Sequence, residues 1–110
     1  LVDETAHLVG EVLERHPEVV TIMREWAQAP NLWVRRVAII SQLGRAATTD
    51  RQLLADVIAP NLADGDFFIR KAIGWALRQY ARTDPEWVRT YVATHPLSAL
   101  SRREATKHLA

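Results

Sequence analysis

The stretch LWVRRVA at residues 32–38 has a counterpart 35 residues later, FFIRKAI at residues 67–73. Each copy has three apolar residues, two basic residues and two apolar residues, and each follows an Asn or Asp of the kind that caps a helix. A third basic pair, Arg102-Arg103, comes 32 residues after Arg70-Lys71. Two-helix units of this length, each of which needs a neighbour to cover its apolar face, are typical of an α-solenoid.

Apolar residues recur at helical spacing along the whole chain, and no stretch alternates with period two for long enough to indicate a strand. The predicted helices cover about residues 3–15, 18–29, 32–43 and 67–81, and others begin near residues 51, 85 and 102. We therefore expect an all-α fold, a superhelix (solenoid) of HEAT-like helical hairpins with six to seven helices. Residues 1–110 should form one such domain.

Residues that favour helix ends stand at most of these boundaries. The expected N-caps are Asn31, Asp50, Asp66 and Asp84. Asp50 and Asp84 are 34 residues apart, which repeats the period of the basic pairs, and Pro85 suits the first position of a helix. Residues 101–104, SRRE, have the form of a capping box that opens the last helix.

Composition narrows the class of protein further. The chain has 110 residues, of which 48% are hydrophobic, and no cysteine, so thiolate nucleophiles, cysteine-based zinc sites and disulfides are excluded. It has neither an apolar run of membrane-spanning length nor a signal peptide, and we expect a cytoplasmic monomer that does not contact a membrane. Because it begins at Leu1 without a methionine, we expect a processed product or a piece of a longer protein.

Charge is unevenly distributed, with a net −4 over residues 1–30 and +5 over residues 31–110. In the helix predicted over 67–81, Lys71, Trp75, Arg78 and Arg82 form a stripe that contains no acidic residue. Such a stripe suits phosphates and sugars, although a tryptophan there could equally pack against the next repeat. Gly74 lies inside the same helix and indicates a close approach, either by a neighbouring helix or by a backbone phosphate.

The usual catalytic motifs are absent from the sequence, and the four histidines lack metal-ligand spacing, so we expect neither a metal nor a cofactor. Two tryptophans, Trp26 and Trp33, flank the predicted turn at Pro30-Asn31. Indoles in such a position can wall a cleft for a planar base or can seal adjoining repeats.

The sequence as a whole resembles the AlkD-like DNA alkylation repair family. The resemblance rests on residues 26–39 (WAQAPNLWVRRVAI), 67–78 (FFIRKAIGWALR), 80–88 and 100–108, and it covers nearly the whole chain. Members of this family are about twice as long, so the resemblance identifies this chain as a C-terminal half. It implies HEAT-like repeats whose basic concave face holds duplex DNA, and hydrolysis of the N-glycosidic bond of cationic purines such as N3-methyladenine or N7-methylguanine.

The family pattern has a tryptophan, an aspartate four residues later, a second tryptophan and a basic pair. Trp26, Trp33 and the pair Arg35-Arg36 match it, and the resemblance implies that the two tryptophans line the lesion site. The aspartate position falls on Pro30, so no catalytic residue is assigned. The expected DNA-binding residues are Arg35, Arg36, Arg70, Lys71, Trp75, Arg78, Arg102, Arg103 and Lys107.

Two other functions remain open from the sequence. Pro30 in place of an acid favours a family member that binds DNA without excising bases. A helical scaffold that binds an acidic protein partner through the same basic face is the further alternative.

Overall fold

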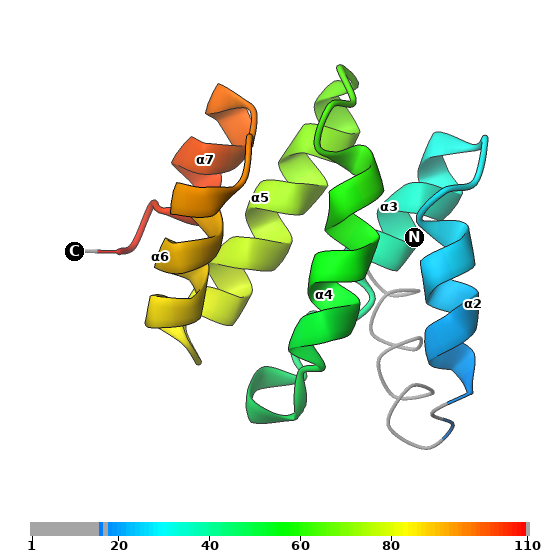
Figure 1. Ribbon diagram of the computed structural model, residues 1–110, viewed down its shortest axis with the longest axis horizontal. Coiled ribbons are helices and arrows are strands. Elements are labelled where there is room, and N and C mark those ends of the chain that lie inside the picture. Colours follow the sequence, from blue (N-terminus) through cyan, green and yellow to red (C-terminus); the bar gives the residue numbers. More distant parts are fainter. Residues whose placement is uncertain (1–15, 17, 110) are drawn as a thin grey trace.

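The computed structural model describes residues 16 and 18–109, so the helix expected over residues 3–15 lies outside the described part. The described residues form six α-helices: α2 (Val19–Trp26), α3 (Leu32–Ile40), α4 (Arg51–Ile58), α5 (Phe67–Ala81), α6 (Pro85–Thr94) and α7 (Ala99–Ala105) (Figure 1). Two single turns of 3-10 helix, η1 (Ala46–Thr48) and η2 (Ala59–Asn61), stand before and after α4. No strand occurs among the described residues, and the predicted all-α class is confirmed.

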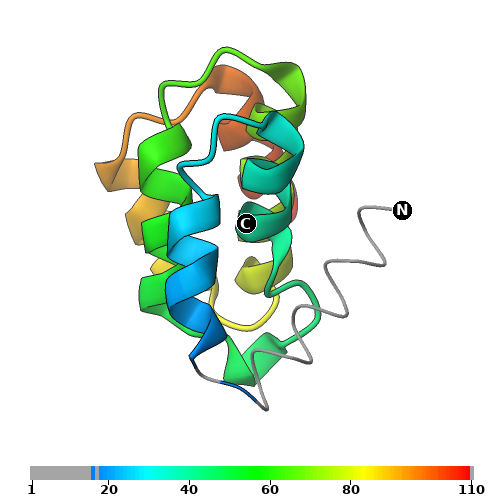
Figure 2. The same cartoon turned by 90° about the vertical axis from the view of Figure 1, so that its right-hand side faces the viewer.

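The helices form two layers. Helices α3, α5 and α7 lie side by side in one layer, and α2, α4 and α6 form the other, as the end-on view in Figure 2 shows. The chain thus passes from one layer to the other in successive hairpins, α2–α3, α4–α5 and α6–α7, as a helical solenoid does. Equivalent helices of successive hairpins therefore bring the recurring basic pairs to the same layer.

Four predicted caps are found at the helix starts. The side chains of Asn31, Asp50, Asp66 and Asp84 each accept a hydrogen bond from a backbone N–H in the first turn of α3, α4, α5 and α6. The capping box at residues 101–104 is wrong, because Ser98 caps α7 and Ser101 lies within that helix. Ser101 is buried instead, and its hydroxyl donates to the Arg70 carbonyl oxygen at 2.8 Å, which ties α7 to α5.

Helix α3 ends at Ile40, three residues before the predicted end. The Ser41 hydroxyl donates to the Ala38 carbonyl oxygen at 2.8 Å, and the backbone then tightens into i+3 turns. Gly44 follows with a φ of 85°, a value that favours glycine, and redirects the chain into η1. The distance between helices α3 and α4 along the chain is therefore greater than the sequence suggested.

The core lies between the two layers. Its largest fully buried side chains include Met23 of α2, Ile39 of α3, Leu53 of α4 and Leu77 of α5. Asn61 is also buried, and its amide donates to the carbonyl oxygens of Ala27 (2.8 Å) and Val57 (3.0 Å). This amide fixes the end of α2 against the end of α4 and so holds the turn that leads into α3.

Candidate nucleic-acid interface

The three basic pairs divide in the same way at each repeat. The first arginine of each pair donates hydrogen bonds to backbone carbonyls in the connection before its helix and, for Arg102, also in the last turn of the preceding helix α6. Arg35 donates to Ala29 and Pro30, Arg70 donates to Asp64 at 3.1 Å, and Arg102 donates to Val92 and His95. Adjacent helical residues point about 100° apart, so the second member of each pair is directed elsewhere. The first members thus brace the fold, and we call Arg35, Arg70 and Arg102 the bracing arginines.

The second members, Arg36, Lys71 and Arg103, come from α3, α5 and α7, which form one layer. The Arg36 guanidinium lies 5.9 Å from the centre of the Trp75 ring, and its Nη1 lies 3.4 Å from the Phe68 carbonyl oxygen. Lys71 and Arg103 are exposed, and so is Lys107, which follows Arg103 by four residues. We call the residues Arg36, Lys71, Arg103 and Lys107 the basic row.

A carboxylate joins this layer from α7. Glu104 accepts from Lys71 Nζ at 2.7 Å and from Arg78 Nη1 at 3.2 Å, and its side chain is only 14% exposed. The stripe on α5 that lacked an acidic member in the sequence therefore has one in space. The hydrogen bond from Lys71 lowers the pKa of Glu104 below its ordinary value of 4.5, and the charges of Lys71, Lys107 and Arg78 act in the same direction.

The lowered pKa of Glu104 predicts how stability depends on pH. A carboxyl whose pKa is lower in the folded state stabilises the fold above its unfolded pKa, and this contribution is lost as pH falls through the folded value. We expect the free energy of unfolding of the natural chain to fall more steeply below pH 4.5 than that of Glu104→Gln. Urea denaturation between pH 3 and 6 measures this difference, and parallel curves would contradict it.

Three aromatic rings gather beside the basic row, where α3 and α5 begin. The rings of Trp33 and Phe68 lie 5.2 Å apart, those of Phe68 and Phe67 lie 5.4 Å apart, and the three residues are 46–56% exposed. Trp26, at the end of α2, is 38% exposed. The ring that packs against Trp33 is that of Phe68 and not that of Trp26, the tryptophan with which Trp33 was paired in the sequence analysis. Phe67 and Phe68 were not identified as site residues from the sequence. Their position offered a signal, because they are the first two residues after the N-cap Asp66 and come before Ile69, where the buried face of α5 begins.

The turn at Pro30 contains a carboxylate from elsewhere in the chain. Arg35 Nη1 donates to the Ala29 and Pro30 carbonyl oxygens, and its Nη2 lies 2.9 Å from Asp64 Oδ2. The other oxygen of Asp64 accepts the Asp66 N–H at 2.8 Å. An open cleft of about 410 Å³ runs along this turn. Asp64 was not found from the sequence because it lies 34 residues from Pro30.

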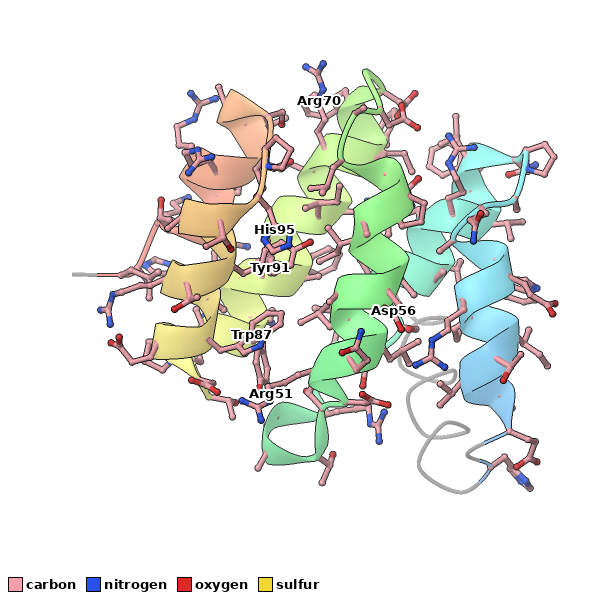
Figure 3. All side chains as sticks on the ribbon, viewed as in Figure 1. Arg51, Asp56, Arg70, Trp87, Tyr91 and His95 are labelled. Atoms are coloured by element: carbon pink, nitrogen blue, oxygen red, sulfur yellow. The ribbon has the colours of Figure 1, made fainter. Side chains whose placement is uncertain are left out.

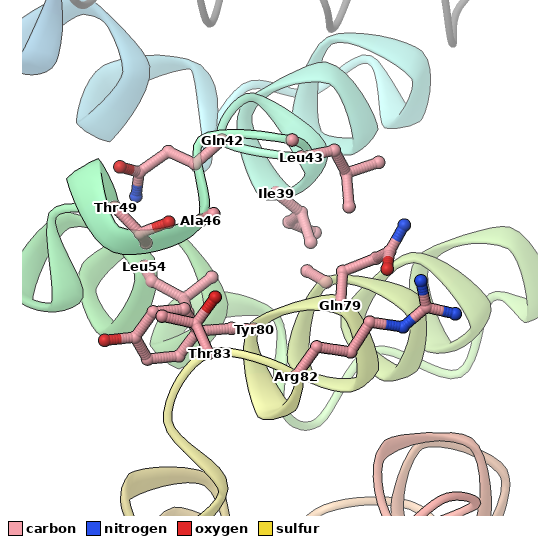
Figure 4. Close-up of a pocket in the computed structure, with 12 residues that line it drawn as sticks. Ile39, Gln42, Leu43, Ala46, Thr49, Leu54, Gln79, Tyr80, Arg82 and Thr83 are labelled. Carbon is pink, nitrogen blue, oxygen red and sulfur yellow. The ribbon is translucent and has the colours of Figure 1, made fainter.

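Two further cavities lie away from the predicted site residues. One of about 250 Å³ lies between the C-terminal ends of α3 and α5, and Ile39, Tyr80 and Arg82 line it (Figure 4). The other, a groove of about 520 Å³ between α4 and α6, contains the stacked rings of Tyr91 and His95, 3.8 Å apart (Figure 3). Burial raises the pKa of Tyr91 to about 12. None of the eleven predicted aromatic and basic site residues lines either cavity.

Residues 16 and 18–109 contain neither a metal-binding cluster nor a helix that could cross a membrane. Within this part of the chain, no three histidine or acidic side chains come together as they would around a metal ion. No helix in the same part has the length and apolar character needed to cross a membrane.

Comparison with known proteins identifies a protein family and a similar solved structure. The family model of the DNA alkylation repair enzymes matches residues 1–109. A solved structure, described as a predicted DNA alkylation repair enzyme from Enterococcus faecalis, superposes with a TM-score of 0.85 at 38% sequence identity. The match covers 93% of this chain and 48% of that protein, so this chain spans about half its length. No curated protein matches the chain.

Proposed function

Because the chain belongs to the DNA alkylation repair enzyme family, we propose that it binds duplex DNA through the layer of α3, α5 and α7. The observation that carries this proposal is the basic row, in which each of these helices supplies an exposed or half-exposed cation. Neighbouring packed helices are about 8–10 Å apart. Cations repeated at that interval can follow a phosphate backbone, which supplies most of the sequence-independent affinity for DNA.

The other predicted residues take different roles in this proposal. Arg78 and Trp75 lie in the same layer and add to the surface, and the ring of Trp75 is covered by the Arg36 guanidinium. Arg35 and Arg102 have internal hydrogen-bond partners, so we assign them to bracing. Arg70 braces through Nε, and its terminal nitrogens point away from α5 in Figure 3, where they can meet a phosphate at the edge of the surface.

We propose further that the protein releases cationic alkylated purines, such as N3-methyladenine and N7-methylguanine, by hydrolysis of the N-glycosidic bond. The positive charge of such a base weakens that bond, so the protein has to hold the nucleotide and stabilise a cationic sugar in the transition state. Trp26 and Trp33 would line the lesion site, since exposed indoles attract a cationic base through their π faces. Phe68, against Trp33, extends this aromatic surface.

A second candidate is a member of the family that binds DNA without excising bases. Two observations favour it: Pro30 holds the position at which the family pattern has an acid, and both oxygens of the nearby Asp64 are engaged by Arg35 and the Asp66 N–H. A carboxylate that is paired in this way supplies little charge to a developing cationic sugar.

Release of free methylated bases from methylated duplex DNA, measured by mass spectrometry, tests the excision proposal. We expect release by the natural protein and at least a tenfold lower rate for Trp26→Ala, which removes an aromatic wall of the lesion site. Ile22→Ala, which also shortens an exposed apolar side chain of α2, is the control and should keep the rate.

Absence of release by a protein that still binds DNA would reject excision in favour of the second candidate. Pro30→Asp should then restore release, because it returns an acid to the position where the family pattern has one. Absence of DNA binding at low salt would reject both candidates and leave an acidic protein partner for the basic row.

A further inference from the structure

Glu104 occupies a position in the proposed DNA-binding layer at which a negative charge opposes the function. Its two oxygens accept from Lys71 (2.7 Å) and Arg78 (3.2 Å), which lie on either side of Trp75 along α5. We propose that Glu104 restrains the attraction of this layer for phosphates, and that Lys71 and Arg78 exchange Glu104 for DNA phosphates on binding. This inference rests on the proposed function and adds to it a residue that sets the affinity.

The backbone of Glu104 is held firmly in place. Helix α7 crosses α5 at Gly74, where an added Cβ would lie only 2.6 Å from Glu104 Cβ and 3.2 Å from the Ser101 carbonyl oxygen. Ser101 in turn is bonded to the Arg70 carbonyl. Close packing therefore keeps the Cβ of Glu104 beside α5, so the carboxylate remains within side-chain reach of this layer when its cationic partners leave.

The two cations are freer to move than their shared partner. The Lys71 side chain is 45% exposed and the Arg78 side chain 26%, against 14% for Glu104. Bonds from cations to carboxylate and to phosphate are of the same charge-assisted type, so the cations keep equivalent partners, and the cost of the exchange falls on the Glu104 carboxylate that they leave. Release of counterions from DNA favours the exchange. Two cations and one anion carry a net charge of +1, and Glu104 therefore offsets half of the charge that this pair offers to a phosphate.

Titration of a labelled undamaged duplex at several salt concentrations, followed by fluorescence anisotropy, tests this inference. Glu104→Gln keeps the size of the side chain and an oxygen that accepts from Lys71 or Arg78, and it removes the charge. We expect about three- to tenfold tighter binding at 50 mM salt, and a slope of log affinity against log salt that is steeper by up to about 0.9.

Glu86→Gln is the matched control. It changes the net charge of the chain by the same amount, but Glu86 lies on α6 in the other layer and pairs with Arg89. Exposed charges more than about 10 Å apart are largely screened at 0.1 M salt. Glu86→Gln should therefore leave both the affinity and its slope close to those of the natural chain.

A double-mutant cycle adds a readout that a purely structural role for Glu104 would not change. Lys71→Gln should lower the affinity for DNA more in the Glu104→Gln background than in the natural chain. In that background Lys71 has no ion pair to break before it contacts a phosphate. This coupling remains measurable if one variant is less stable, provided that circular dichroism shows it folded at the assay temperature.

The outcomes separate this inference from the proposed function. If the natural chain binds DNA and Glu104→Gln binds equally or more weakly, the inference is overturned and the proposed function stands. If Glu104→Gln and Glu86→Gln tighten binding equally, net charge explains the effect and the inference is again overturned. If neither the natural chain nor Glu104→Gln binds at low salt, the proposed function is overturned and the inference with it.

Discussion

Gly74→Val is expected to lower the free energy of unfolding by about 3 kcal/mol, the upper part of the range for overpacking a well-packed core. Carbon atoms in contact are normally 3.5–4.0 Å apart, whereas a Cβ at Gly74 would lie 2.6 Å from Glu104 Cβ. That neighbour is attached to the backbone of α7 and cannot rotate away. Helices α5 and α7 would have to separate by about 1 Å, which strains the bond from Ser101 to Arg70 and the ion pairs of Glu104.

Thermal and urea denaturation followed by circular dichroism measure this change, with a fall in Tm of about 10–20 °C expected for a domain of this size. Gly65→Ala is the control, because Gly65 is exposed and an added Cβ there meets only the end of the Arg70 side chain at 3.7 Å. That substitution should be neutral or slightly stabilising. A Gly74→Val protein with the Tm of the Gly65→Ala control would show that α7 does not pack as described.

Replacing Lys71, Arg103 and Lys107 together with Gln is expected to weaken duplex binding about 100-fold at 0.1 M salt. All three side chains are exposed and belong to the basic row. Each phosphate contact contributes about −0.9 to the slope of log affinity against log salt, so the loss of three contacts should make the slope shallower by about 2.7. Anisotropy titrations from 50 to 300 mM salt would give both quantities.

The matched control for this triple variant replaces Arg24, Arg51 and Arg89 with Gln, one on each helix of the α2, α4 and α6 layer. These arginines form exposed or half-exposed ion pairs with Asp56, Asp84 and Glu86, and such pairs contribute little to stability. The control removes the same charge from the opposite layer. If both triple variants weaken binding equally, net charge and not the basic row determines the affinity.

Local signals in the sequence were sufficient for most of the fold. Side-chain caps such as Asp66 and the breaks in apolar periodicity marked the helix starts, since both act within one turn of the chain. The 35-residue recurrence of the basic pairs placed α3 and α5 as equivalent helices. The errors arose where two nearby residues could serve the same purpose or where a side chain competed with the helix for a backbone group. Ser98, and not Ser101, caps α7, and the Ser41 hydroxyl binds the Ala38 carbonyl where α3 ends early. Close approach at Gly74 was predicted, and the structure shows that a helix makes it.

The candidate site was less accessible from the sequence because its ion pairs join distant residues. Glu104 lies 33 residues from Lys71, and Asp64 lies 29 residues from Arg35. Spacing within one helix shows which residues share a face, and it does not show which side chain of another helix comes opposite. Sequence reasoning recognised that the two members of a basic pair point apart, but only the hydrogen bonds show that the first member binds carbonyls of the preceding connection or helix end.

In each hairpin, a bracing arginine on the second helix holds the loop that joins the two helices of that same hairpin. Arg35 binds carbonyls in the loop of the first hairpin and Arg70 a carbonyl in that of the second. In the third hairpin Arg102 binds the Val92 carbonyl at the end of α6 and the His95 carbonyl in the loop. Backbone carbonyls are present whatever the loop sequence, so duplication of one hairpin would copy this closure together with the cation that the hairpin adds to the layer of α3, α5 and α7. A stack of such hairpins can gain or lose a whole hairpin without needing new contacts between hairpins that are not neighbours. The cooperativity of its unfolding depends on the interfaces between neighbouring hairpins.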